Sequence, residues 1–329
     1  MPLLAISTLL VTVTLAISYF CYRQCFYSPP QKHSDPYEPL VGQQFQAVEK
    51  EIFRVTGIME RYSFEDVSAT ANDGTPLRAR YYHVADGAPL MILCHGYRSS
   101  ALRDCSGGHI LSRKLGFNAL VIHQRAHGES GGTAITFGIR EREDLHSWIR
   151  YANERFGPDT PIIVYGISMG AATVLMGAEL GYPDNVACIM ADSPYSSPSD
   201  IILKVCKDMG YPPKLAYPFV WLGALIFGRF RLGTCSAREA VRHSRIPILL
   251  IHGEDDRLVP AEMSDRIAKA CTCLCRVYTF PNAGHGLCYL TDPQRFERVV
   301  FDFLNEIPTI SPFLSDSFKE TMNRPPEKL

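Results

Sequence analysis

A serine between two glycines marks the segment of this chain best suited to chemistry. Residues 166–170 read Gly-Ile-Ser-Met-Gly, after a short apolar run at 162–165 and before small and apolar residues at 171–176. This order predicts a strand, a sharp turn and a helix, with the hydroxyl of Ser168 exposed on the turn. The helix would direct its free N–H groups at whatever the serine attacks. The pattern alone arises by chance in about one chain in ten of this length, so its context must supply the specificity.

A serine hydroxyl is a weak nucleophile at neutral pH and needs a base, which in turn needs a group to orient it. On a strand–turn–helix site the carboxylate and the histidine follow the serine in that order along the chain. Asp256 follows an apolar run at 248–251, and His285 follows another at 276–280. We therefore expect Ser168 to be the nucleophile, His285 the general base and acid, and Asp256 the carboxylate that orients the imidazole.

The oxyanion formed by such an attack requires two hydrogen-bond donors. One expected donor is the backbone N–H of Met169, directly after the nucleophile. The other should come from the loop after the apolar run 90–93, and we expect the backbone N–H of Tyr97. Two alternatives remain open for the carboxylate. Asp255 is adjacent to Asp256, and Asp192 ends the apolar run 186–191.

The elements that must position these residues follow from the spacing of the apolar runs. Residues 62–71 and 77–84 read as two strands around a turn at 72–75. Short apolar runs then alternate with helical stretches, as expected for strands buried on both faces of a parallel sheet. Helices are predicted for residues 46–60, 141–156 and 293–303. An insertion rich in aromatic and proline residues, about 193–245, is predicted to form a helical cap that either holds an acyl group or only covers a cleft.

The N-terminal segment differs from the rest of the chain, because residues 2–22 contain no charged residue. Its length suits a transmembrane helix. A secretory signal peptide is the alternative, but the segment lacks a basic start and a good cleavage site. Arg23 and Lys32 follow the run and favour a cytoplasmic catalytic domain. The expected organisation is an anchor at 1–24, a linker and leading helix at 25–59, and a catalytic domain at 60–329.

Composition limits the classes of ligand. The net charge is −1 with no basic stripe, which argues against a nucleic-acid partner. The chain has eleven scattered cysteines. Secreted proteins usually pair their cysteines in disulfides, so this odd number fits a reducing compartment. Cys271, Cys273 and Cys275 alternate and could suggest a metal, but no familiar zinc spacing accompanies them, so small apolar fillers are the preferred interpretation. No cofactor or metal site is expected. Cys21 and Cys25 are read as fillers beside the membrane, with acylation as the alternative.

Taken together, the motifs resemble those of α/β-hydrolase-fold serine hydrolases over roughly residues 60–305. The resemblance rests on five segments of the chain: His95-Gly96, the loop 125–130, residues 166–170, residues 252–260 and Gly284-His285-Gly286. It implies an α/β-hydrolase fold, with a mostly parallel twisted sheet flanked by helices, and its spacing favours Asp256 over Asp255. Within the fold, the chain is similar to bacterial membrane-tethered members near the serine-aminopeptidase-like and carboxylesterase-like branches. It departs from many members at residues 123–128, where a structural loop is expected.

These observations predict a membrane-bound enzyme that hydrolyses a carboxylic ester through an acyl-enzyme. The expected substrate is a small acyl compound, and the anchor and the apolar cap favour a lipophilic one. A peptidase or aminopeptidase and an acyl thioesterase are alternatives on the same three side chains. A catalytically inactive binding protein on the membrane is the alternative from another class.

Overall fold

The predicted α/β-hydrolase fold is confirmed by the computed structural model, which describes residues 2–29, 35–39 and 42–323. These residues form an eight-stranded sheet in the order β1-β2-β4-β3-β5-β6-β7-β8. The first two strands form an antiparallel hairpin, β2 pairs antiparallel with β4, and all later pairs are parallel. Lys32, one of the two basic residues behind the predicted orientation, lies outside the described residues.

The strands and helices have the following bounds. The strands are β1 (Glu65–Thr70), β2 (Pro76–Tyr82), β3 (Leu90–Cys94), β4 (Asn118–His123), β5 (Ile162–Ile167), β6 (Val186–Asp192), β7 (Ile248–Gly253) and β8 (Cys275–Phe280). The helices are α1 (Pro2–Cys25), α2 (Gln43–Gln46), α3 (Glu49–Met59), α4 (Ala101–Leu115), α5 (Glu141–Phe156), α6 (Met169–Gly177), α7 (Pro198–Asp208), α8 (Pro213–Ile226), α9 (Ala237–Ala240), α10 (Glu262–Ala270), α11 (Cys288–Thr291), α12 (Pro293–Asn305) and α13 (Asp316–Asn323).

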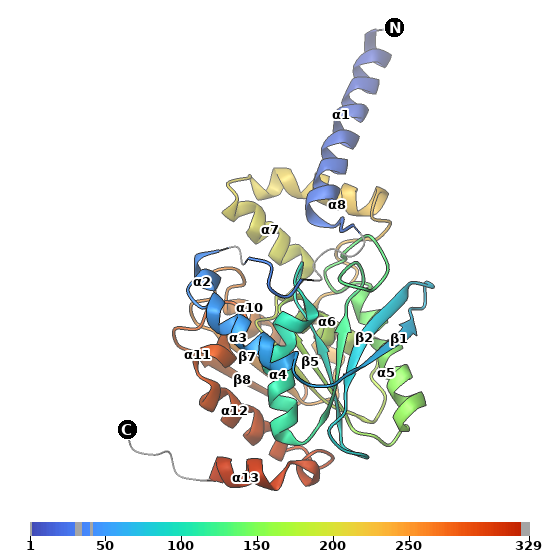
Figure 1. Ribbon diagram of the computed structural model, residues 1–329. Coiled ribbons are helices and arrows are strands. Elements are labelled where there is room, and N and C mark those ends of the chain that lie inside the picture. The colour runs from blue at the N-terminus through green and yellow to red at the C-terminus, as the bar shows by residue number, and fades with distance from the viewer. Residues whose placement is uncertain (1, 30–34, 40–41, 324–329) are drawn as a thin grey trace.

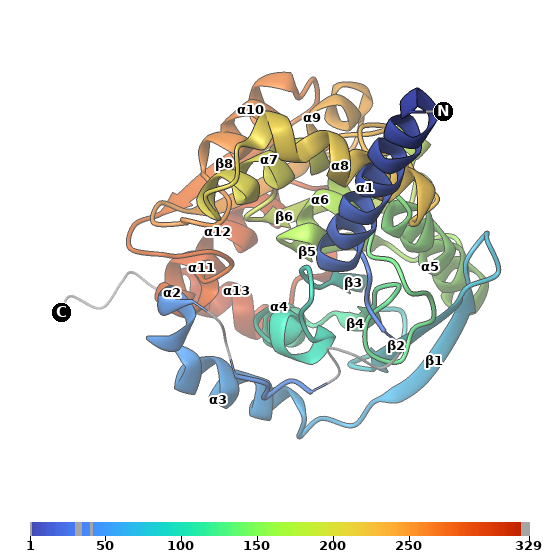
Figure 2. The same ribbon diagram turned by 90° about the horizontal axis from the view of Figure 1, so that it is seen from above.

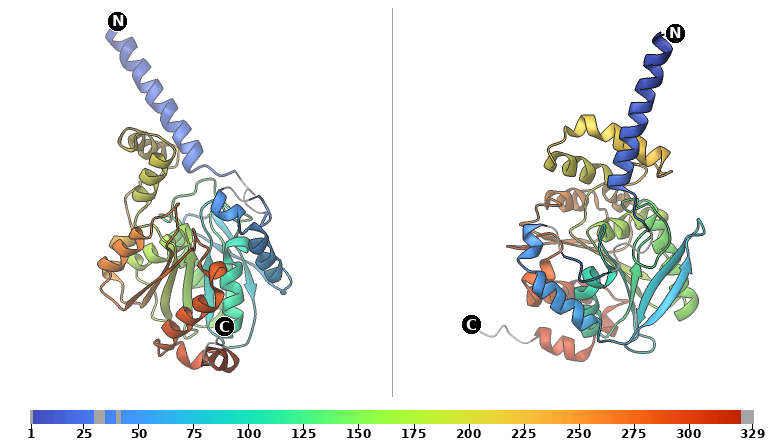
Figure 3. Two further views of the ribbon diagram at one scale, coloured as in Figure 1. Left: turned by 90° about the vertical axis from the view of Figure 1, so that its left-hand side faces the viewer. Right: turned by 45° about the horizontal axis from the view of Figure 1, so that its top comes forward.

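The central strands β3 to β7 are apolar over most of their length because helices cover both faces of the sheet. In β3, for example, Leu90 and Ile92 pack into the cluster that holds α5, α6 and α10. Met91 and Leu93 point to the opposite cluster, which holds α3, α4, α12 and α13. Figures 2 and 3 show these two helical layers on either side of the sheet.

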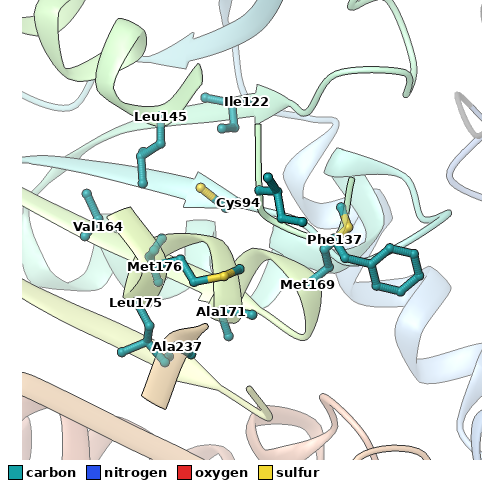
Figure 4. Packing of buried hydrophobic residues seen from close by; sticks show 14 of the residues in the cluster. Cys94, Ile122, Phe137, Leu145, Val164, Met169, Ala171, Leu175, Met176 and Ala237 are labelled. Atoms are coloured by element: carbon teal, nitrogen blue, oxygen red, sulfur yellow. The ribbon is translucent and has the colours of Figure 1, made fainter. Parts of the chain in front are cut away.

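Helix α6, which follows Ser168, is buried along its whole length. Figure 4 shows its Met169, Ala171 and Leu175 among side chains from the sheet and from neighbouring helices, including Val164 and Leu145. Small residues and methionines fill this narrow space without a charged group. The packing therefore holds the start of α6, and with it the turn at Ser168, firmly against the sheet.

Helix α1 projects from the body of the molecule, with its first turns clear of the domain (Figure 1). Residues Leu3–Cys25 are long and apolar enough to cross a membrane, with a mean hydropathy of 2.1, and most of this helix is exposed. The insertion between β6 and β7 forms α7, α8 and α9. Its helix α8 lies across the base of α1 and contacts it (Figure 1).

Candidate active site

Ser168 occupies a strained turn between β5 and α6. Its backbone angles are φ 56° and ψ −114°, a conformation that a residue with a side chain rarely adopts. The two glycines are required by close approach of the backbone. A Cβ atom on Gly170 would lie 2.0 Å from the carbonyl oxygen of Cys94, and one on Gly166 would lie 2.2 Å from the carbonyl carbon of Gly170. Met169 begins α6, so its N–H lies at the positive end of that helix.

His285 and Asp256 come together although 29 residues separate them. The Nδ1 atom of His285 lies 2.6 Å from Oδ2 of Asp256. The other carboxylate oxygen accepts hydrogen bonds from the backbone N–H groups of Leu258 and Val259, at 2.9 and 2.8 Å. His252 adds a further contact, with Nε2 3.2 Å from Oδ2. The turn after β7 and His252 thus hold the carboxylate through contacts that do not involve His285.

This environment keeps Asp256 ionised. Burial alone would raise the pKa of its carboxyl group. Electrostatic attraction to His285 and hydrogen bonds from His252, His285 and the backbone of Val259 outweigh burial and hold the pKa of Asp256 well below its usual value. A carboxylate that stays charged can orient the imidazole and stabilise the imidazolium that forms when His285 takes a proton.

The two alternative carboxylates have other surroundings. Asp255 is exposed, and its backbone N–H donates to the carbonyl of Ala283. Asp192 is buried; its Oδ1 accepts from the hydroxyl of Ser193 at 2.8 Å, and its carbonyl accepts from the N–H of Ser168. Burial, the largest effect, raises the pKa of Asp192 to about 6. Of these three carboxylates, Asp256 is the one with a hydrogen bond to His285.

Ser168 and His285 line the same cavity, whose volume is about 440 Å³. Asp192, Gly96 and Tyr97 line it too. Among the described residues, the remainder of the wall comes from the N-terminal segment, the loop after β3, α4, β5, the turn after β7 and the region around α11, and none comes from the insertion 193–245. These further residues are Glu38, Pro39, Phe45, Ile52, Arg98, Ser99, Arg103, Asp104, Ser106, Gly107, Gly108, Tyr165, Ile167, Leu258, Gly286, Leu287, Tyr289 and Leu290.

The loop expected to supply an oxyanion donor is held on both sides of Tyr97. The N–H of Gly96 donates to Oδ2 of Asp104 at 2.8 Å, and the N–H of Arg98 donates to Nε2 of His127 at 3.0 Å. Arg98 also has a positive φ of 50°. Asp104 and His127 therefore fix the backbone around the N–H of Tyr97. The sequence signal for His127 was the loop 125–130, whereas nothing in the sequence pointed to Asp104.

The same loop is attached to the end of α1. The hydroxyl of Tyr97 donates to the carbonyl of Cys25 at 2.8 Å. The guanidinium of Arg98 donates to the carbonyls of Gln24 at 2.8 Å and Tyr27 at 3.2 Å. The carbonyls of Gln24 and Cys25 belong to the last turn of α1 and have no partner within the helix, so the two side chains satisfy them. Two residues of the cavity wall thus contact the end of the apolar helix directly.

The cysteines form no disulfide, and all eleven are free. The Sγ atoms of Cys271 and Cys273 lie 3.2 Å apart at the edge of the sheet before β8. Within the described residues, no group of three His, Cys, Asp or Glu side chains is arranged to hold a metal ion.

Comparison with known proteins agrees with this architecture. Residues 91–299 match the family described as the alpha/beta hydrolase family. The uncharacterized protein YqkD of Bacillus subtilis is 25% identical over 260 residues, which cover 78% of this chain and 83% of YqkD. The protein bem46 of Schizosaccharomyces pombe is 26% identical over 195 residues, which cover 58% of this chain and 59% of bem46.

Solved structures show the same fold. The esterase Pf2001 of Pyrococcus furiosus superposes with a TM-score of 0.64 at 22% identity, covering 85% of this chain and 98% of the esterase. At this identity the likeness concerns the fold alone.

Proposed function

The chain belongs to the alpha/beta hydrolase family, and we propose that it is a membrane-tethered serine hydrolase that cleaves a carboxylic ester. The observation that carries the proposal is the 2.6 Å hydrogen bond between His285 and a buried, ionised Asp256, on a cavity wall that also contains Ser168. A histidine held in this way can serve a serine on a strained turn as general base.

The reaction proceeds in two steps. The Oγ atom of Ser168 attacks the carbonyl carbon of the ester while His285 takes the hydroxyl proton, and the N–H groups of Tyr97 and Met169 bind the resulting oxyanion. Collapse breaks the bond to the alcohol, which leaves with the proton from His285. Water, activated by the same imidazole, then attacks the acyl-enzyme and releases the acid and free Ser168. The net reaction consumes one ester and one water and yields an acid and an alcohol.

An ester substrate is supported by the fold shared with the solved esterase Pf2001. A lipophilic substrate is supported by the position of the cavity, whose residues Tyr97 and Arg98 bond to the end of α1. We propose that α1 is an uncleaved membrane anchor. The basic residue Arg23 directly after the apolar run supports a catalytic domain on the cytoplasmic side.

Labelling with a fluorophosphonate probe tests the nucleophile. The wild-type protein should be labelled, and the Ser168→Ala variant should not, whereas a matched Ser193→Ala variant should keep the label. An unlabelled wild-type protein that is folded would favour a binding protein instead.

Hydrolysis rates identify the bond that is cleaved. We expect p-nitrophenyl esters of different chain length to be cleaved faster than aminoacyl-p-nitroanilides. Faster cleavage of the anilides would contradict the ester and favour a peptidase on the same residues.

A further inference from the structure

Helix α8 exposes an apolar surface that is unusual for a helix in water. The chain carries no charged residue between Lys214 and Arg229. Leu215 is 70% exposed and Trp221 is 38% exposed. A helix that is apolar on all sides is normally buried in protein or in lipid. We define the α8 face as the exposed large apolar side chains on α8 and the turn before it: Met209, Tyr211, Leu215, Trp221 and Ile226.

The helix that carries the α8 face crosses α1 at close range. A Cβ atom on Gly223 would lie 2.4 Å from the carbonyl oxygen of Ser18, so only glycine allows this approach. The ring of Phe227 lies 5.1 Å from that of Tyr19 and 6.1 Å from that of Tyr22. Helix α8 therefore contacts the stretch Ser18–Tyr22 of α1, and it runs across α1 in the ribbon (Figures 1 and 3).

The position of this crossing along α1 determines the depth of α8 relative to the membrane. The uncharged run from Pro2 to Tyr22 forms about 31 Å of helix, close to the thickness of a bilayer's hydrocarbon core. A charged side chain is costly inside that core, so Arg23 marks the boundary. Ser18–Tyr22 are the last residues before it and span about 6 Å of the helix axis. Helix α8, which packs on them, lies at the level where the hydrocarbon core meets the polar headgroups.

We propose that the α8 face lies in the membrane interface beside α1 and contacts lipid of the leaflet next to the catalytic domain. The proposal rests on the anchor proposed above. Tyr211 and Trp221 suit this depth, since their rings combine an apolar body with a polar group. A helix of this kind lies in the membrane plane with its apolar side buried about 5–10 Å into the interface.

If the α8 face contacts lipid, the insertion helps to hold the catalytic domain at the membrane, and the substrate can come from the leaflet. None of the described cavity-lining residues comes from the insertion, so the α8 face is free to contact lipid while the cavity stays open. Tyr97 and Arg98 on the cavity wall bond to the last turn of α1, just below the crossing. An ester that is dissolved in the leaflet would thus meet the cavity at the membrane surface.

The two tryptophans of the chain provide the test, because they report from different places. Trp221 belongs to the α8 face, whereas Trp148 is fully buried in α5. Full-length wild type and the Trp221→Phe variant are reconstituted into phosphatidylcholine vesicles with or without bromine at acyl carbons 6 and 7. The difference between their spectra isolates Trp221. We expect brominated lipid to remove at least half of the Trp221 emission and to leave the Trp148 emission nearly unchanged.

Two results would overturn the proposal. Quenching of Trp221 by aqueous acrylamide but not by brominated lipid would mean that the α8 face meets water. Protection from both quenchers would mean that a second copy or another protein covers it.

Extraction with alkaline carbonate distinguishes a failure of the α8-face proposal from a failure of the proposed membrane anchor. Protein released from the vesicles would contradict the anchor and the α8 face together. Protein that stays in the membrane with an unquenched Trp221 would contradict the α8 face alone. Fluorophosphonate labelling of Ser168 reports on the hydrolase independently of both.

A pair of variants tests the consequence for the substrate. Leu215→Asp places a charge on the α8 face; Phe313→Asp, on an exposed residue that precedes α13 at the opposite end of the molecule, is the control (Figure 1). We expect Leu215→Asp to slow hydrolysis of p-nitrophenyl palmitate in vesicles about tenfold and to leave p-nitrophenyl acetate unaffected. Phe313→Asp should change neither rate. Equal effects of Leu215→Asp on both esters, or no effect on either, would contradict delivery from the leaflet.

Discussion

The hydroxyl of Tyr97 donates a 2.8 Å hydrogen bond to the backbone carbonyl of Cys25, the last residue of α1. The ring of Tyr97 also stacks on Phe137, with centroids 4.9 Å apart. The residue whose N–H we assign to the oxyanion is therefore attached by its side chain to the apolar helix. A shift at the end of α1 would be transmitted to the donor through one rigid side chain.

Replacing Tyr97 with Phe should lower kcat while KM stays unchanged. The variant keeps the backbone N–H and the ring stacking but loses the bond to Cys25, which is worth about 1 kcal/mol. We expect kcat for a short p-nitrophenyl ester to fall about three- to tenfold, because a misplaced donor weakens binding of the oxyanion and not of the substrate. Tyr289→Phe removes a hydroxyl from another residue of the cavity wall and should leave kcat unchanged. A lower melting temperature with unaltered kcat would indicate a purely structural bond.

Asp256 and Asp192, which are both buried, should differ sharply in their effect on catalysis. Asp256→Asn would leave His285 in the wrong tautomer, and kcat should fall by about 10³ to 10⁴. Asp192→Asn keeps an acceptor for Ser193 and should cost less than about tenfold. Ester hydrolysis by the two variants at pH 8 provides the measurement. The opposite ranking would move the orienting role to Asp192.

Asp192 should also make the fold less stable as the pH rises. Burial raises its pKa to about 6 in the folded protein, above the value of about 3.9 in an unfolded chain. The folded state therefore binds this proton more tightly, so its stabilising effect is complete below about pH 4 and is lost as the pH rises through 6. We expect Asp192→Asn to raise the melting temperature by several degrees at pH 8 and hardly at all at pH 4. An equal shift at both pH values would show that ionisation of Asp192 is not the cause.

The sequence predicted the central strands well because they are buried on both faces. The run Leu90–Leu93 and the later apolar runs fall within parallel strands, and helix α5 has the predicted bounds 141–156. The sequence pattern does not predict helix α4. Its Gly107 and Gly108 are poor helix formers, yet a Cβ atom on Gly108 would lie 2.6 Å from the ring of Tyr165. Close packing against the sheet therefore requires glycine at position 108. Helix propensities describe single residues and cannot reveal such a tertiary contact.

Part of the geometry of the candidate site also follows from the sequence. The order of Ser168, Asp256 and His285 follows the strand ends, and the structure brings Asp256 and His285 into contact. The contact between Tyr97 and Cys25 joins residues 72 positions apart, so no local pattern reports it. The aromatic residues of the insertion indicated an apolar surface, but only the crossing at Gly223 reveals that α1 is its neighbour.

Phe26 should contribute strongly to stability although it lies outside the stretch 60–305 that carries the family motifs. It is fully buried, and its ring packs edge-on against Phe137 and Phe230 at centroid distances of 5.7 and 5.1 Å. Truncating a buried aromatic residue leaves a cavity, so Phe26→Ala should lower the free energy of unfolding by about 3–5 kcal/mol.

Thermal unfolding of the full-length protein in detergent, followed by near-UV circular dichroism, measures the effect of Phe26→Ala. Phe20→Ala is the matched control, because Phe20 is an exposed residue of α1 and its truncation should cost less than about 0.5 kcal/mol. If both variants unfold like the wild type, the segment after α1 is only a tether. If Phe26→Ala alone is destabilised, this segment is part of the folded core, and the end of α1 is fixed relative to the loop that carries Tyr97.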